Sequence, residues 1–97
     1  MKILALEHEI PGMTAEQFHP HLRAEAARVW ELYQAGVLRE IYFSQDEHTA
    51  VLILECSDAA EAHQVLNTLP LVKEELISFQ VIPLMPYSGL ARLFVER

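Results

Sequence analysis

Histidines gather near the start of this 97-residue chain, in a pattern that favours proton-transfer chemistry. Three of the five lie where a first strand ends and a first helix begins: His8, His19 and His21. Imidazole titrates near neutrality, so His8 and His21 are candidate catalytic acids or bases. His19 and His21 are two residues apart and point to different sides of a helix, so only one of them can share a site with His8. A metal site and exposed turn histidines are the alternatives, and we predict no bound metal.

Further candidates follow on the same predicted helix. His21 and Glu25 have the i,i+4 spacing at which a carboxylate supports a charged imidazole, which makes Glu25 a candidate catalytic residue. A guanidinium binds a carboxylate through two parallel hydrogen bonds, so Arg23 is a candidate for substrate binding. Trp30 and Tyr42 are candidates for aromatic contacts with a substrate. The alternatives are a solvated helix face for the charged residues and core or interface packing for the aromatic ones.

Glutamates interrupt the apolar strands. Glu7, Glu40 and Glu55 each lie in an otherwise apolar run. A carboxylate half-buried on a sheet tends to have a raised pKa, which suits a general base. Glu40 alternates with Leu38 and Tyr42 and is the strongest of the three as a catalytic candidate, although each could equally point to solvent.

The motifs of several other chemistries are missing from the sequence. The three glycines stand apart, at positions 12, 36 and 89, and there is no serine nucleophile elbow, HExxH or CxxC. The single cysteine, Cys56, ends an apolar run and is expected to be a buried structural thiol. Nucleophilic and nucleotide-dependent catalysis are therefore unsupported, and we expect no cofactor.

The chain is acidic, with a formal net charge of −7 and a pI of about 5.1. Its seven basic residues are scattered, so nucleic acid and anionic membranes are not expected partners. No run approaches the roughly 20 apolar residues of a membrane-spanning helix. The opening MKILALEHEIPG is typical of a strand and not of a signal peptide. We therefore expect a cytoplasmic location.

Periodicity predicts the elements that position these residues. Residues 1–8 form a first strand, which ends at a Pro-Gly turn. A helix then starts at Thr14, whose spacing to Gln17 is that of a capping box, and stops before Gly36. Pro20 lies inside this helix and lacks a backbone N–H, so we expect one bent element.

Two strands at 37–44 and 49–56, joined by a polar turn, are predicted to form an antiparallel hairpin. Strict alternation assigns Leu38 to the same sheet face as Glu40 and Tyr42. This face lies opposite the one predicted for the other apolar residues of the strand.

A second helix is expected from about residue 57, ending at the Leu-Pro-Leu of residues 69–71. The last strand, 76–84, ends in prolines and suits an edge position. Residues 88–97 form a tail with a short helix, whose apolar side chains need a surface to cover: Leu90, Leu93 and Phe94.

The resulting order, β-α-β-β-α-β, is that of an α+β, ferredoxin-like fold with a four-stranded antiparallel sheet. We expect residues 1–97 to form a single domain, with both crossover helices on one face of the sheet. The second face is also apolar, and 52% of the residues are hydrophobic. Packing two such faces together would remove that exposure, which predicts a homodimer of the dimeric α/β-barrel kind.

Several segments carry a resemblance to a known family. The main ones are Leu66-Asn67-Thr68-Leu69-Pro70-Leu71-Val72 and Phe79-Gln80-Val81-Ile82-Pro83-Leu84. Supporting them are Lys2-Ile3-Leu4, Leu22-Arg23-Ala24-Glu25 and Gly36. Over roughly residues 1–88 the chain resembles the muconolactone isomerase-like branch of the dimeric α/β-barrel superfamily.

Muconolactone isomerase moves a double bond within a carboxylate-bearing lactone by proton transfer, without a cofactor. The resemblance implies a pocket with an acid/base pair and a cation for the carboxylate, and it places Arg23 and Glu25 at such positions. We therefore expect a small cofactor-free isomerase or lyase that acts on a small carboxylated or carbonyl metabolite. The alternatives are a non-catalytic ligand-binding or assembly module and a cofactor-free monooxygenase of the same fold.

Overall fold

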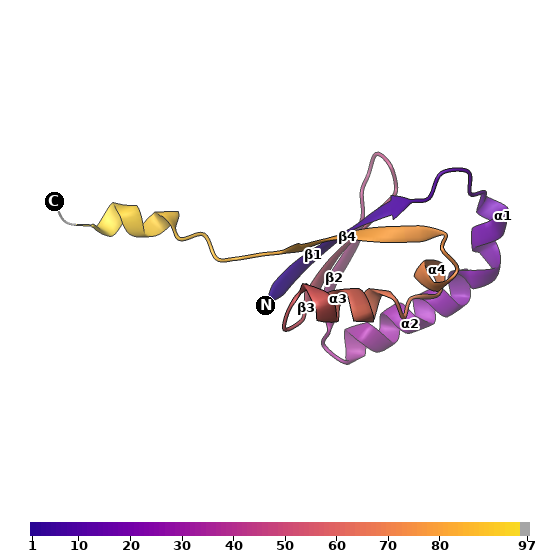
Figure 1. Cartoon of the computed structure of the whole chain (residues 1–97), viewed down its shortest axis with the longest axis horizontal. Coiled ribbons are helices and arrows are strands. Elements are labelled where there is room, and N and C mark those ends of the chain that lie inside the picture. Colours follow the sequence, from indigo (N-terminus) through magenta and orange to yellow (C-terminus); the bar gives the residue numbers. More distant parts are fainter. Residues whose placement is uncertain (96–97) are drawn as a thin grey trace.

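A four-stranded antiparallel sheet forms the body of the protein in the computed structural model, which describes residues 1–95 (Figure 1). The strands are β1 (Lys2–Glu9), β2 (Leu38–Phe43), β3 (Ala50–Glu55) and β4 (Ile77–Pro83). They lie in the order β2-β3-β1-β4, with every neighbouring pair antiparallel. The predicted hairpin of β2 and β3 and the edge position of β4 are confirmed.

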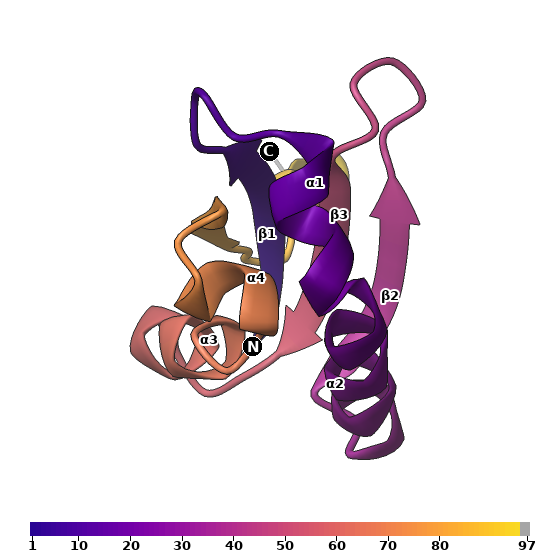
Figure 2. The ribbon, with the colours of Figure 1, turned by 90° about the vertical axis from the view of Figure 1, so that its right-hand side faces the viewer.

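Helices cover one face of this sheet (Figure 2). They are α1 (Ala15–Phe18), η1 (His19–His21), α2 (Leu22–Gln34), α3 (Ala59–Leu66) and α4 (Pro70–Lys73). Strands and helices follow one another as the sequence predicts, so the α+β, ferredoxin-like arrangement is confirmed.

The first helical stretch is continuous from residue 15 to residue 34, but it changes type at Pro20. There a short 3-10 turn, η1, separates α1 from α2, because proline cannot donate to the carbonyl four residues back. The stretch begins as predicted, since the side chain of Gln17 accepts a 2.7 Å hydrogen bond from the Thr14 N–H. It stops before Gly36, as predicted, and the φ of +79° at Gly36 is easily adopted only by glycine.

The end of the second helix differs from the prediction. Helix α3 already ends at Leu66, and Pro70 does not terminate it but is the first residue of α4. Proline suits that position because the first N–H of a helix has no intrahelical partner and φ is already helical. The start is as expected, with the Asp58 carboxylate accepting the Glu61 N–H at 2.8 Å.

The predicted alternation in β2 is wrong at Leu38. Leu38 pairs with Leu54, whereas Glu40 pairs with Ile53, so Arg39 is an extra residue in β2. This bulge turns Leu38 to the helix-covered face, where only 1% of it is exposed. A two-residue period cannot anticipate such an insertion, because the sequence on either side keeps its alternation.

The core lies between the helices and the covered face of the sheet. Its most deeply buried large side chains come from three strands and from α3 with the loop that follows it: Ile3, Leu38, Leu52, Leu54, Leu66 and Leu69. The opposite face, which we call the open face, carries partly buried apolar side chains: Leu4, Leu6, Val51, Ile53 and Ile82. The predicted burial of Cys56 is confirmed.

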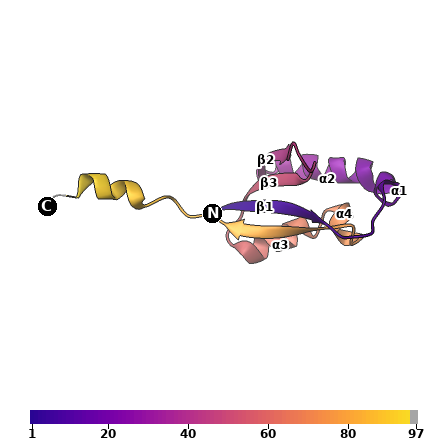
Figure 3. The same cartoon turned by 90° about the horizontal axis from the view of Figure 1, so that it is seen from above.

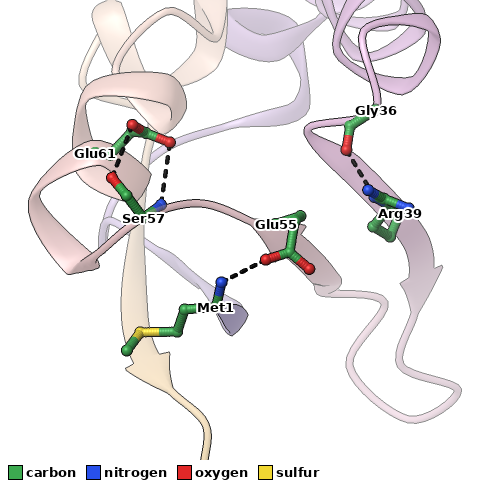
Figure 4. A network of polar contacts seen from close by, with 6 residues as sticks. All are labelled: Met1, Gly36, Arg39, Glu55, Ser57 and Glu61. Atoms are coloured by element: carbon green, nitrogen blue, oxygen red, sulfur yellow. Dashed lines mark hydrogen bonds and ion pairs between the residues drawn. The ribbon is translucent and has the colours of Figure 1, made fainter.

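Polar contacts tie together the end of the sheet at which β1 begins (Figure 4). The Met1 amino group contacts the Glu55 carboxylate at the end of β3, and this contact lowers the pKa of Glu55. Nearby, the Glu61 carboxylate accepts hydrogen bonds from the N–H and the hydroxyl of Ser57, at 3.2 and 3.0 Å. Glu55 is therefore an exposed carboxylate at a strand end and is paired with the amino terminus. This matches the alternative of a solvent-exposed glutamate and not that of a half-buried general base.

The chain beyond β4 leaves the body as an extended arm, residues 84–95, that carries the 3-10 helix η2 (Gly89–Phe94) (Figures 1 and 3). Its apolar side chains are strongly exposed, Leu93 to 75% and Phe94 to 83%. Within residues 1–95, no helix has the length and apolar character needed to cross a membrane.

Candidate functional site

A cavity of about 320 Å³ lies between α2 and the covered face of the sheet. Apart from two glutamates, Glu7 and Glu25, every residue that lines it is apolar. The apolar lining residues are Leu22, Ala26, Val29, Ile41, Phe43, Ala50, Leu52, Leu69, Leu71, Ile77 and Phe79. Leu22, Ile41 and Phe43 are the most exposed of these large side chains, which places the mouth between α2 and β2. The volume is at the small end of the range for ligand pockets.

Glu7 reaches this cavity from β1. It alternates with Ile3 and Ala5, which face the helices, so its side chain points to the same side of the sheet. Its carboxylate accepts a 2.8 Å hydrogen bond from the Ala50 N–H of the neighbouring strand. Burial raises the pKa of Glu7, and the negative charge of Glu9 adds to the rise, while the Ala50 N–H and His48 partly offset it.

Glu25 reaches the cavity from the first turn of α2. Its carboxylate accepts a 3.0 Å hydrogen bond from the Leu71 N–H, near the start of α4. That N–H has no partner within its own short helix, so Glu25 also fixes the position of α4 against α2. Burial raises the pKa of Glu25, the Leu71 N–H offsets part of this rise, and the charge of Glu7 raises the pKa further.

The two glutamates make the cavity suitable for proton transfer. Both are half-buried, and each accepts a hydrogen bond from one backbone N–H, which holds its carboxylate at the cavity. A carboxyl group with a raised pKa holds or releases a proton closer to neutral pH, which general acid–base catalysis requires. Two such groups in one apolar cavity can take a proton from one atom of a ligand and return it to another.

His48 is a histidine that acts on this site, and the sequence did not indicate it as a candidate. Its ring stacks on Phe43, with centroids 4.1 Å apart, and Phe43 lines the cavity. Its charge also favours ionised Glu7. The polar turn between β2 and β3 gave no periodic signal that would place His48 beside Phe43.

Comparison with known proteins agrees with the fold and identifies the family. The sequence profile of muconolactone delta-isomerase matches residues 4–89. This chain belongs to the muconolactone delta-isomerase family. No curated protein matches it in a direct search.

Solved structures of similar fold include muconolactone isomerase, with a TM-score of 0.74 and 15% identity over 92% of this chain and 93% of that one. A second is 5-chloro-2-hydroxyhydroquinone dehydrochlorinase (TftG) from Burkholderia phenoliruptrix AC1100, in complex with 2,5-dihydroxybenzoquinone. Its TM-score is 0.72 and its identity 17%, over 92% of this chain and 98% of that one. At these identities the two structures show a shared fold.

Of the four main catalytic candidates, His8, His21, Glu25 and Glu40, the structure of this family member brings only Glu25 into the cavity. His21 immediately precedes α2 and is not among the lining residues. His8 neighbours Glu7 in β1 but points to the open face, where its Nε2 lies 3.4 Å from Oε1 of Gln80. The predicted grouping of His8, His21, Arg23 and Glu25 around one pocket is therefore not found within one chain.

The remaining candidates also lie outside the cavity. Glu40 and Tyr42 meet on the open face, where the Tyr42 hydroxyl donates a 2.7 Å hydrogen bond to Glu40 and the pKa of Tyr42 is raised by this contact. Trp30 is exposed and stacks on Tyr33 at a centroid distance of 5.9 Å. Arg23 is exposed on α2 and does not line the cavity. Roles for these residues stay predictions.

Glu7 also reaches the cavity, although the sequence favoured Glu40 over it among the strand glutamates. The sequence could not single it out, because residues 3–6 are all apolar and only the structure shows that Ile3 and Ala5, on the side of Glu7, face the helices. Within residues 1–95, no group of three or more His, Cys, Asp or Glu side chains could hold a metal ion.

Proposed function

We propose that this protein is an enzyme that moves a proton within a small carbonyl compound, with Glu7 and Glu25 as its acid/base pair and without a cofactor. The observation that supports this most is the meeting of two pKa-raised carboxyls in one apolar cavity. Membership of the muconolactone delta-isomerase family supports the reaction type.

The proposed step is balanced in protons and electrons. One ionised carboxylate takes a proton from the carbon next to the carbonyl, and the electron pair of that C–H bond forms an enolate. In a substrate with a conjugated or adjacent double bond, the electrons reach a second carbon, which takes a proton from a protonated carboxyl. One C–H bond is broken and another is formed, so the net change is a shift of the double bond.

The same first half-step serves an elimination. If the carbon next to the deprotonated one carries a chlorine, the electron pair of the enolate forms a double bond to that carbon and expels chloride. The proton stays on the carboxyl group that took it, and no second C–H bond forms. The fold shared with a dehydrochlorinase motivates this lyase variant of the proposal. Both variants need the base in the cavity, and they differ only in the substrate.

We further propose that two or more copies associate through the open face. This face carries half-buried Leu, Val and Ile side chains that a single chain leaves in contact with water. Covering them with a second sheet is the arrangement expected from the sequence. The cytoplasmic location expected from the sequence stays a prediction.

The test uses cyclohex-3-enone, whose conversion to cyclohex-2-enone is a proton shift from C2 to C4. We expect the wild-type protein to accelerate this conversion, and Glu25→Gln to lower the rate by about 10²- to 10⁴-fold. Glutamine still accepts the Leu71 N–H, so the fold around α4 is kept. The conversion is followed by ultraviolet absorbance of the conjugated product and, in D₂O, by deuterium incorporation in NMR spectra.

Glu31→Gln is the matched control, because Glu31 lies on the same helix but on its exposed side, 3.7 Å from Arg28. Its rate should equal that of the wild type. Equal rates for wild type, Glu25→Gln and Glu7→Gln would refute the acid/base assignment.

A further inference from the structure

The charge pattern of the cavity is one-sided. Two carboxylates line it, and among the residues that form its wall there is no lysine, arginine or histidine. The cation expected from the family resemblance, Arg23, lies on α2 outside this wall. The cavity thus differs from the pocket that the sequence led us to expect, which paired an acid/base group with a cation for a substrate carboxylate.

Arg28 and Arg39 make their polar contacts with residues outside the cavity wall. The Arg28 guanidinium donates a 2.9 Å hydrogen bond to the Thr68 hydroxyl and lies 3.7 Å from Glu31. The Arg39 guanidinium donates a 2.7 Å hydrogen bond to the carbonyl of Gly36, at the far end of β2. His48 is the basic group whose charge acts on Glu7, and it stacks on Phe43 without lining the cavity.

Two effects would weaken the binding of an anionic ligand in such a cavity. Its own charge would lose water to an apolar wall, and no described side chain of the wall would replace that hydration. It would also be repelled by whichever of Glu7 and Glu25 is ionised, and repulsion between like charges is stronger in a poorly hydrated site. An uncharged ligand of the same shape avoids both costs and gains from burial of its apolar surface.

We propose that the substrate of this site is uncharged, a small ring or chain with carbonyl or hydroxyl oxygens and no carboxylate. This inference rests on the proposed function and narrows it, because the sequence left carboxylated and carbonyl metabolites equally open. It also separates this chain from the carboxylate-bearing lactone after which the family is named. Glu7 and Glu25 then have two roles, since they move the proton and also exclude anions.

A matched pair of probes tests the proposal without turnover. Cyclohex-2-enone is uncharged, and 3-oxocyclohex-1-ene-1-carboxylate has the same ring with one added carboxylate. Affinities of the full chain for both are measured by NMR titration near neutral pH, following the signals of residues that line the cavity. We expect the enone to bind at least about tenfold more tightly than its carboxylate.

Charge removal supplies the second arm of the test. Glu25→Gln should bind the carboxylate several-fold more tightly than wild type does, while its affinity for the enone stays the same. Glu31→Gln, on the exposed side of the same helix, should leave both affinities unchanged.

The proposal is overturned if the carboxylate binds as tightly as the enone, if neither probe binds, or if Glu25→Gln leaves the ratio of the two affinities unaltered. Each of these three results concerns the exclusion of anions and is distinct from failure of the proposed proton transfer. Binding that favours the enone, without any conversion of cyclohex-3-enone, would refute the proton transfer but leave the exclusion of anions in place.

Discussion

Each cavity glutamate accepts a hydrogen bond from a backbone N–H of another element, and this contact and burial together set its pKa. Glu25 joins α2 to α4 through the Leu71 N–H, and Glu7 joins β1 to β3 through the Ala50 N–H. These hydrogen bonds favour the ionised forms, but burial outweighs them, so both pKa values are raised. A proton on either carboxyl therefore stabilises the folded state relative to the unfolded chain.

The stability of the protein should report this balance. Between the ordinary glutamate pKa and the raised pKa of the folded state, the folded chain holds a proton that the unfolded chain has lost. The contribution of Glu25 to the free energy of unfolding is therefore fully present at low pH and is lost as pH rises through the folded-state pKa. Glu25→Gln cannot titrate there, so its free energy of unfolding should rise relative to wild type as the pH increases from the ordinary glutamate pKa through the raised pKa of the folded state.

Urea unfolding followed by circular dichroism, at matched protein concentration and at several pH values, measures this difference. Glu31→Gln should run parallel to wild type, since Glu31 is exposed. Parallel curves for Glu25→Gln and wild type would show that the cavity does not perturb Glu25.

At the scale of elements, the sequence predicted order and type well and local irregularities poorly. Caps, helix stops and periods identified all four strands and both crossover helices, because each signal depends on neighbouring residues only. The bulge at Arg39 and the new helix at Pro70 depend on how strands pair and how α4 packs against α2. The site shows the same division, since Glu25 was selected by residue type and helix position, whereas Glu7 required knowing which face of β1 is covered.

The bulge leads to a prediction about β2. Leu38→Ala should lower the free energy of unfolding by about 2–5 kcal/mol, because a buried leucine would leave a cavity beside Leu54. Arg39→Ala, one residue away, should cost about 1 kcal/mol or less, since it loses a single exposed hydrogen bond. Chemical unfolding of the two variants makes the comparison. Equal, small losses would mean that Leu38 faces outward, as strict alternation suggested.

For the whole molecule, the open face and the arm are the parts that one chain alone does not explain. The sequence indicated that both need a covering surface, and the structure shows how far the arm extends from its own body: the molecule measures 63 × 29 × 21 Å. Hydrophobic side chains of the helices and the sheet pack against one another within the chain. Those of an arm directed away from the body have no such contacts within the described chain. Composition and pattern therefore favour association of copies, which stays a prediction, and they do not indicate its geometry.

The arm leads to a prediction about association of copies. If its apolar side chains pack on a second copy, replacing Leu93 and Phe94 together by serine should weaken that association by about 100-fold or more, since burying each such side chain contributes about 1.5–3 kcal/mol. The far-ultraviolet circular dichroism should not change, because neither residue contributes to the core. Arg92→Ser is the matched control in the same helix. Sedimentation velocity over a range of concentrations measures the effect, and the same distribution of species for the double variant and wild type would place the association elsewhere, on the open face alone.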